Sequence, residues 1–284
     1  MGIFFDACLQ GRGKTFLFHI ILLQYINGVS AMKIEDMRKS LNFRELGGYT
    51  SEDGRKVRSG QFFRCGPLAD LNEEEFAFVR SLGIRHVFDF RSEYEATEVP
   101  DPDIGAEYHQ INAMVDGSGN QVQFDPKGIE AAAKEHEQAN DFIEKMYGSL
   151  PYCEAYKEMF KAIKAHETPI LFHCSAGKDR TGIAAVLILL LLGVDEKTAL
   201  DDYELTNEYR KEQIERFFEK VAPMIAGMPE VKQILMAFEG VNRSSAQYSL
   251  DTIRSSYADY GLYFEDVFGI DENIRKELQN IYLV

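Results

Sequence analysis

The chain has 284 residues, of which 45% are hydrophobic, enough for the core of one large domain or two small ones. Its 46 acidic and 31 basic side chains give a formal net charge of −15, which excludes nucleic acid as an expected partner because the phosphate backbone would be repelled. The four cysteines, scattered without CxxC spacing, argue against a disulfide framework or a cysteine zinc site and favour a reducing compartment.

Residues 1–31 have the outline of a secretory signal. A basic GRGK stretch precedes the apolar run Phe16–Ile26, and Val29–Ala31 resembles a small-residue cleavage site. The apolar run is short and interrupted by polar residues, and the sequence MKIED from Met32 reads as an ordinary cytosolic start. The segment is therefore a signal, a membrane-proximal anchor or an extension from a misplaced start codon, and we favour the last. This predicts a cytoplasmic protein without stable membrane insertion, or a secreted one if the signal is functional.

Strand-like and helix-like stretches alternate from about residue 40 onward. Asn72 is predicted to cap a helix whose first turn is Glu73–Glu75 and which ends at Gly83. Short apolar runs between turn signals predict strands at Gln61–Arg64, Ile84–Phe90, Glu107–Ile111 and Ile170–His173.

The second half of the chain is predicted to be mostly helical. The polar residues 115–140 are interpreted as a mobile loop with a short helix, in the role of a lid. Helical spacing follows over Phe142–His166 with a break at Pro151, then over the apolar Thr181–Leu192 and through most of Asp195–Val284. We therefore expect one α/β domain over residues 32–284, with a central, mostly parallel sheet flanked by helices and a helical C-terminal part.

A C-x5-R motif joins the last predicted strand to the apolar helix. The loop reads CSAGKDR from Cys174 to Arg180 and continues with Thr181. Backbone N–H groups of such a loop and of the following helical turn converge on an anion. The predicted phosphate-binding residues are Ser175, Ala176, Gly177, Lys178 and Thr181.

The residue types in this loop suit phosphoryl transfer. Arg180 offers a bidentate, permanently charged fork to phosphate oxygens. The same positive field lowers the pKa of Cys174, which favours a nucleophilic thiolate. His173 is expected to hold the loop by hydrogen bonds, and the Thr181 hydroxyl to steady the sulfur as a leaving group. A lone cysteine at a strand end is usually a core residue, but the GKDRTG turn that follows favours a nucleophilic role for Cys174.

The segment HCSAGKDRTG resembles the signature loop of the protein tyrosine phosphatase superfamily. Its GKDR form is similar to the atypical bacterial tyrosine and lipid phosphatases, described as triple-specificity enzymes. Other segments also resemble motifs of that family: NFRELGGY at Asn42–Tyr49, GRKVRSGQFFRCGP at Gly54–Pro67, FDFRSEYE at Phe88–Glu95 and DDYELTNEYR at Asp201–Arg210. The resemblance extends from near Leu41 to the end of the chain.

The resemblance implies that Cys174 is the nucleophile and Arg180 the phosphate clamp. The chain has no tryptophan, so it has no intact WPD loop to supply the general acid. In the atypical branch the loop aspartate, here Asp179, is a proposed acid. Asp89 is the alternative acid, or it orients a loop arginine. Either aspartate could instead have a structural role. Asp179 would then form a salt bridge to Arg180, and Asp89 one to Arg64 or Arg91.

Several other side chains are secondary candidates. Lys178 resembles the loop lysine of lipid phosphatases, or it is a solvated surface lysine. Arg64 and Arg91 are supporting residues that could add cations for a second phosphate; the alternative is that Asp179, Asp89 and neighbouring glutamates neutralise these cations internally. Cys65 is interpreted as a buried cysteine in preference to a redox partner of Cys174. The histidines show no metal-ligand spacing and are interpreted as structural: His86, His109 and His166.

The predicted function is hydrolysis of phosphate monoesters through a cysteinyl-phosphate intermediate, without a cofactor or a metal. The expected substrates are proteins carrying phosphotyrosine, with phosphoserine, phosphothreonine and phosphoinositides as further candidates. The alternatives are a phosphoinositide-preferring lipid phosphatase and a module that binds phosphorylated ligands without turnover. The second is disfavoured because Cys174 and Arg180 are both present. A sulfur-transferring or arsenate-reducing enzyme is disfavoured by the GKDRTG continuation.

Overall fold

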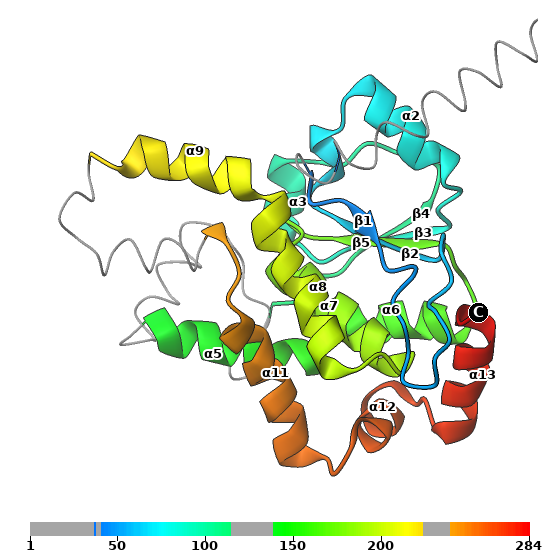
Figure 1. Cartoon of the computed structure of the whole chain (residues 1–284). Helices are drawn as coiled ribbons and strands as arrows, with labels where there is room; N and C mark the ends of the chain where they lie inside the picture. The colour runs from blue at the N-terminus through cyan, green and yellow to red at the C-terminus, as the bar shows by residue number, and fades with distance from the viewer. Residues whose placement is uncertain (1–36, 38–40, 115–138, 224–238) are drawn as a thin grey trace, which may run out of the picture.

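A five-stranded sheet forms the centre of the computed structural model, which describes residues 37, 41–114, 139–223 and 239–284 (Figure 1). The strands are β1 (Arg44–Glu45), β2 (Phe62–Cys65), β3 (His86–Asp89), β4 (Glu107–Gln110) and β5 (Ile170–His173). Their order is β1-β2-β5-β3-β4; β1 runs antiparallel to β2, and the other three pairs are parallel. The expectation of a mostly parallel central sheet is confirmed.

The register aligns the carboxyl ends of the three inner strands. Cys65 of β2 and Asp89 of β3 both pair with His173, the last residue of β5. Ligands of open α/β sheets bind beyond this edge. The segment that begins at Cys174 therefore leaves the sheet where binding sites of such folds occur.

Alternating side chains of the strands fill two separate cores. Phe62, Phe88 and Phe172 point to one face and pack with α6 and α7, whereas Val87 and Leu171 point to the other face and pack with α2. This is the two-residue period of a strand buried on both sides. Figure 1 shows α2 on one side of the sheet and the larger set of helices on the other.

The described helices agree with the sequence pattern in type and approximate bounds, except for the short helix at Glu93–Glu98, which the sequence did not predict. They are α2 (Glu73–Ser81), α3 (Glu93–Glu98), α5 (Ala139–Ser149), α6 (Glu154–Lys164), α7 (Asp179–Leu191), α8 (Glu196–Tyr209), α9 (Lys211–Val221), α11 (Arg243–Ser256), α12 (Tyr260–Phe268) and α13 (Glu272–Tyr282), with 3-10 turns at Leu68–Asp70 and Leu150–Tyr152. The cap of α2 at Asn72 and the break at Pro151 are both confirmed. The proposed lid falls almost wholly in residues 115–138, outside the described residues.

Helix α7 is the buried centre of the larger core. Its apolar residues Ile183–Leu191 are all buried, packed among α6, α8, α11 and α12. A helix that is apolar all round is stable in water only when other elements cover it. Among the described helices, none is long and apolar enough to cross a membrane. The hydrophobicity of α7 therefore serves to fix the helix, and with it the loop at its N-terminus.

Candidate active site

The loop 174–180 runs from the end of β5 into the first turn of α7. Cys174 is 2% exposed, and Arg180, which lies in that first helical turn, is 8% exposed. The N-terminus of a helix presents unsatisfied N–H groups and partial positive charge to whatever lies in front of it. The buried strand and the buried helix thus hold a cysteine and an arginine at a site suited to an anion.

The surroundings of Cys174 favour its thiolate. Burial alone would raise the pKa of the thiol, but the charge of Arg180, the Thr181 hydroxyl and the N–H groups of Ala176 and Thr181 outweigh burial and lower the pKa. Among the described residues the buried Thr181 hydroxyl has no other hydrogen-bond partner. The sulfur therefore lies where negative charge is stabilised, as nucleophilic chemistry requires.

Gly177 lets the loop pass against β2. Its φ is 63°, and a Cβ at this position would lie 2.4 Å from the carbonyl oxygen of Cys65. Only glycine meets both requirements without moving the backbone. Two side chains then hold the Gly177 carbonyl: Asn42 Nδ2 donates to it at 2.8 Å and Arg64 donates to it at 2.9 Å.

A buried ion network supports the loop from behind. Arg64 and Arg44 both pair with Asp202 of α8, with N–O distances of 2.7 and 2.9 Å, and Arg44 also donates to Asn42 Oδ1 at 2.6 Å. Burial and the charge of Arg44 lower the pKa of Arg64 to about 10. Arg64 thus supports the loop, but it is wholly buried and offers no cation to a second phosphate, which corrects that expectation.

Arg180 is held by a carboxylate of α3. Its two terminal nitrogens lie 2.8 and 2.9 Å from the two oxygens of Glu95, which also accepts a hydrogen bond from Ser175. Burial opposes ionisation, but the hydrogen bonds and charge of Arg180 dominate and lower the pKa of Glu95 to about 2. Ser92 caps α3 in a capping box with Glu95. The orientation of Arg180 is therefore tied to the start of α3.

Asp179 has a partner at each carboxylate oxygen. Tyr147 of α5 donates to Oδ1 at 2.5 Å, and Nζ of Lys178 lies 3.1 Å from Oδ2. Tyr147 also shares a 2.6 Å hydrogen bond with Tyr203 of α8. Among the described residues, the carboxylate of Asp179 pairs with Tyr147 and Lys178. The structural alternative for Asp179, a salt bridge to Arg180, is not among these contacts. The Asp179 side chain is 24% exposed, at the surface of the loop.

A second buried cluster lies on the other face of the sheet. Asp89 is bonded to Arg91, and Arg91 also meets Asp101 at 2.6 Å. Nε2 of His173 lies 3.1 Å from Asp101 Oδ2, and the carboxylates of Asp101 and Asp89 raise the pKa of His173 although burial alone would lower it. The Asp89–Arg91 pair matches the structural alternative for Asp89. Arg91 is 1% exposed, so like Arg64 it is not available to a substrate anion.

Several of these side chains were not predicted as site residues from the sequence. Glu95, Asp202 and Asn42 lie in segments that resemble family motifs, but no local spacing assigns them a partner. Tyr147 is 32 residues from Asp179. Asp101 carried no signal beyond its place in a loop. Cys65, in contrast, fits its interpretation: burial raises the pKa of its thiol well above the ordinary value.

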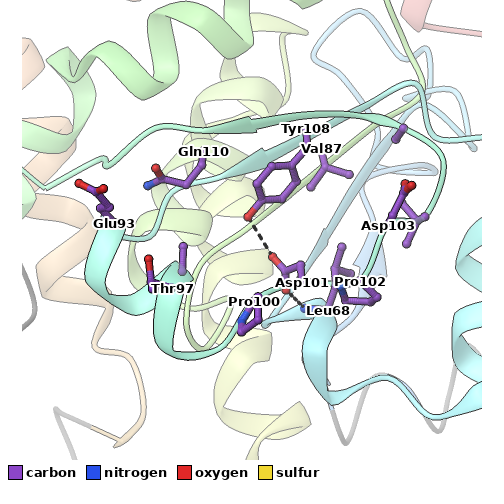
Figure 2. Close-up of a pocket in the computed structure, with 13 residues that line it drawn as sticks. Leu68, Val87, Glu93, Thr97, Pro100, Asp101, Pro102, Asp103, Tyr108 and Gln110 are labelled. Carbon is purple, nitrogen blue, oxygen red and sulfur yellow. Dashed lines mark hydrogen bonds between the residues drawn. The ribbon is translucent and has the colours of Figure 1, made fainter.

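Figure 2 shows a cavity of about 520 Å³ beside α3. Its walls include Glu93 and Thr97 of α3 and Tyr108 and Gln110 of β4, and Asp101 lies within hydrogen-bonding reach of Tyr108. None of the residues that line it belongs to the C-x5-R loop. The cavity is therefore separate from the cysteine site, although the two share the helix that carries Glu95.

Comparison with known proteins agrees with the geometry. A candidate tyrosine-protein phosphatase of Cupriavidus necator is 30% identical over 233 residues, 81% of this chain and 82% of that protein. The triple specificity protein phosphatase PtpB of Mycobacterium tuberculosis is 25% identical over 280 residues, 89% of this chain and 100% of that one.

A solved structure of Pseudomonas aeruginosa TpbA, a cysteine-to-serine variant in complex with phosphotyrosine, is 15% identical and covers 53% of this chain and 71% of that one, with a TM-score of 0.30. The model of the tyrosine phosphatase family matches residues 35–284. The chain therefore belongs to the tyrosine phosphatase family and is a phosphoric monoester hydrolase.

Proposed function

We propose that the protein hydrolyses phosphate monoesters through a cysteinyl-phosphate intermediate on Cys174. The observation that carries this proposal is the position of the buried Cys174 at the end of β5, with Arg180 in the first turn of α7 at the other end of the same loop; the charge of Arg180 and the loop N–H groups lower the pKa of the thiol. A thiolate is the reactive form of cysteine, and fixed donors around it stabilise the charge that develops on a transferring phosphoryl group.

In the first step the Cys174 sulfur attacks phosphorus. An S–P bond forms, the P–O bond to the leaving group breaks, and that oxygen takes a proton from a general acid. In the second step water attacks phosphorus, the S–P bond breaks, and inorganic phosphate leaves. The acid, now a base, accepts a proton from the water, so the enzyme returns to its initial protonation state.

Asp179 is the general acid in this proposal. It lies in the loop, at the first residue of α7, and its side chain is partly exposed, so a substrate oxygen can reach its carboxylate. Asp89 is fully buried and bonded to Arg91 and Tyr108, which commits it to structure. The Tyr147 hydroxyl directs the Asp179 carboxylate, and both are anchored through Tyr203.

The proposed substrates are phosphotyrosine proteins first, then phosphoserine, phosphothreonine and phosphoinositides. The full-length similarity to a triple specificity phosphatase supports this breadth. A lipid phosphatase is the second candidate, because Lys178 places a further cation in the loop. Its Nζ contacts Asp179 and the carbonyl of Gly240, so this cation is already partnered in the described structure.

Turnover of 4-nitrophenyl phosphate tests the proposal. Cys174→Ser should abolish turnover while phosphate-ligand binding persists, and rapid acid quenching of the parent should trap phosphate on Cys174. Cys153→Ser is the matched control, because Cys153 is similarly buried but occupies the N-cap position of α6, where serine is a favourable residue. Activity should survive EDTA. Full turnover by Cys174→Ser would refute the mechanism, and absence of turnover in the parent would favour a binding module.

A further inference from the structure

Two histidines and a glutamate meet at the end of the sheet opposite the cysteine loop. His86 begins β3 and pairs in register with Glu107, which begins β4, and His109 lies two residues further along β4. The pairing and the two-residue period place all three side chains on the same face of the sheet. Their spacing in sequence gave no metal signal, because the pairing of two strands brings them together.

We propose that His86, Glu107 and His109 bind one divalent transition-metal cation, with Zn²⁺ as the best match. Nδ1 of His86 and Nε2 of His109 share a 3.0 Å hydrogen bond, whose proton a cation would replace, and the two nitrogens lie 3.7 Å from Oε2 and Oε1 of Glu107 respectively. Ligand atoms about 2.0–2.1 Å from a tetrahedral zinc are about 3.3 Å from one another. The observed distances lie on both sides of this value, so small rotations of the side chains suffice to enclose the cation.

The surroundings resemble those of a metal-binding histidine. Nε2 of His86, the ring nitrogen that faces away from His109, lies 3.7 Å from a carboxylate oxygen of Glu167. A carboxylate that accepts the outer N–H of a ligating imidazole fixes its tautomer and orientation, and Glu167 would have to close this 3.7 Å gap to do so. The ring of His109 is stacked on Phe88 with a centroid distance of 4.7 Å, which limits its rotation. Glu107 is largely exposed, so water can complete the coordination.

A second group of potential metal ligands in the described residues is less suited to a cation. Asp89, Asp101 and His173 also lie close together, but the guanidinium of Arg91 lies between the two carboxylates, at 2.8 and 2.6 Å. A protein cation therefore already fills that position. Among the described contacts at His86 and His109, in contrast, the neighbouring charged groups are the carboxylates of Glu107 and Glu167.

A cation at this site would join the edge strand β4 to β3 and, through Glu167, to the turn before β5. It would lie at the opposite ends of these strands from Cys174, since His86 pairs with Ile170, the first residue of β5. Its expected role is to stabilise the sheet edge and not to take part in phosphoryl transfer.

Isothermal titration of Zn²⁺ into untagged, EDTA-treated full-length Cys174→Ser protein tests the proposal, since this background removes the catalytic thiolate as a competing ligand. We expect one site whose affinity falls at least about tenfold in His109→Ala and in Glu107→Gln, because loss of even an outer partner of a metal site costs about 10- to 100-fold. His166→Ala is the control: His166 contacts only Glu277 among the described carboxylates, and binding should be unchanged.

Two further measurements keep the proposal falsifiable. Zn²⁺ should raise the melting temperature of the parent background but not of Glu107→Gln, whose exposed side chain can change without disturbing the fold. Co²⁺ should give visible absorption bands without a thiolate charge-transfer band. Absence of binding, equal affinity in the parent and Glu107→Gln, or a thiolate band would each overturn the proposal.

Discussion

Two arginines hold the loop that carries Cys174, and each is buried and paired with a carboxylate, but the groups they serve differ. Arg64 of β2 approaches the loop from behind, pairs with Asp202 and donates to the Gly177 carbonyl, and it is wholly buried. Arg180 lies at the end of the loop, pairs with Glu95 and stabilises the Cys174 thiolate.

The pKa values of the two arginines shift in opposite directions. Burial and repulsion by Arg44 lower the pKa of Arg64, so its charge depends on Asp202. The pKa of Arg180 is raised, because Cys174 and Glu95 outweigh its burial. Both arginines thus pair with a carboxylate, but Arg64 shares Asp202 with Arg44 and holds a backbone carbonyl, whereas the charge of Arg180 lowers the pKa of the Cys174 thiol. Substitutions on each side can test this division.

The largest effect is expected at Asp202. Asp202→Asn removes the common partner of two buried arginines and should lower the free energy of unfolding by about 3–5 kcal/mol. Asp201→Asn is the matched control on the same helix, because Asp201 pairs with Lys197 and Arg243 at the surface and should cost less than about 1 kcal/mol. Urea denaturation measures both. Similar losses in the two variants would show that the buried network is not a principal support of the fold.

The next effect concerns Arg180 itself. Arg180→Lys keeps the charge but loses the planar fork, so kcat/KM for 4-nitrophenyl phosphate should fall about 10²- to 10³-fold per folded molecule, in addition to any loss of stability from the weakened pair with Glu95. Arg64→Lys should lose about 1–3 kcal/mol of stability through unmade buried hydrogen bonds and keep most of its activity per folded molecule. Equal loss of activity in both variants would abolish the distinction between them.

Local spacing in the sequence was sufficient for the loop and for most elements. C-x5-R, the cap at Asn72 and the apolar run of α7 each depend on neighbours in the chain, so they could be predicted. The role of Arg64 could not, because it depends on Asp202, which lies 138 residues away. The strand pairing that places Asp89 beside His173, and His86 beside His109, is likewise a tertiary property. Charge alone left open whether Arg64 and Arg91 serve a substrate anion or are neutralised within the protein, and their burial against Asp202 and Asp89 favours the second.

A smaller effect is expected for the proposed acid. Asp179→Asn should slow phenyl phosphate, a poor leaving group, roughly a hundredfold more than 4-nitrophenyl phosphate, because only the poor leaving group needs a proton. Tyr147→Phe should show the same selectivity to a lesser degree, since it removes the hydrogen bond that directs the carboxylate. Steady-state kinetics with both esters measures this. If Asp179→Asn slows the two esters equally, Asp179 has a structural role and another group must supply the proton.

The smallest effect concerns Lys178. Like Arg64 it donates to a backbone carbonyl, and like Arg180 it belongs to the loop itself. Its Nζ donates to the Gly240 carbonyl at 3.0 Å and lies beside Asp179, and its side chain is 13% exposed. If it exchanges the carbonyl for a second substrate phosphate, Lys178→Ala should raise KM for a phosphoinositide several-fold more than KM for 4-nitrophenyl phosphate. Lys197→Ala removes an exposed lysine of α8 and should change neither KM. An equal change for both substrates would assign Lys178 to the same structural class as Arg64, because a lysine that only anchors Gly240 does not distinguish one phosphate from two.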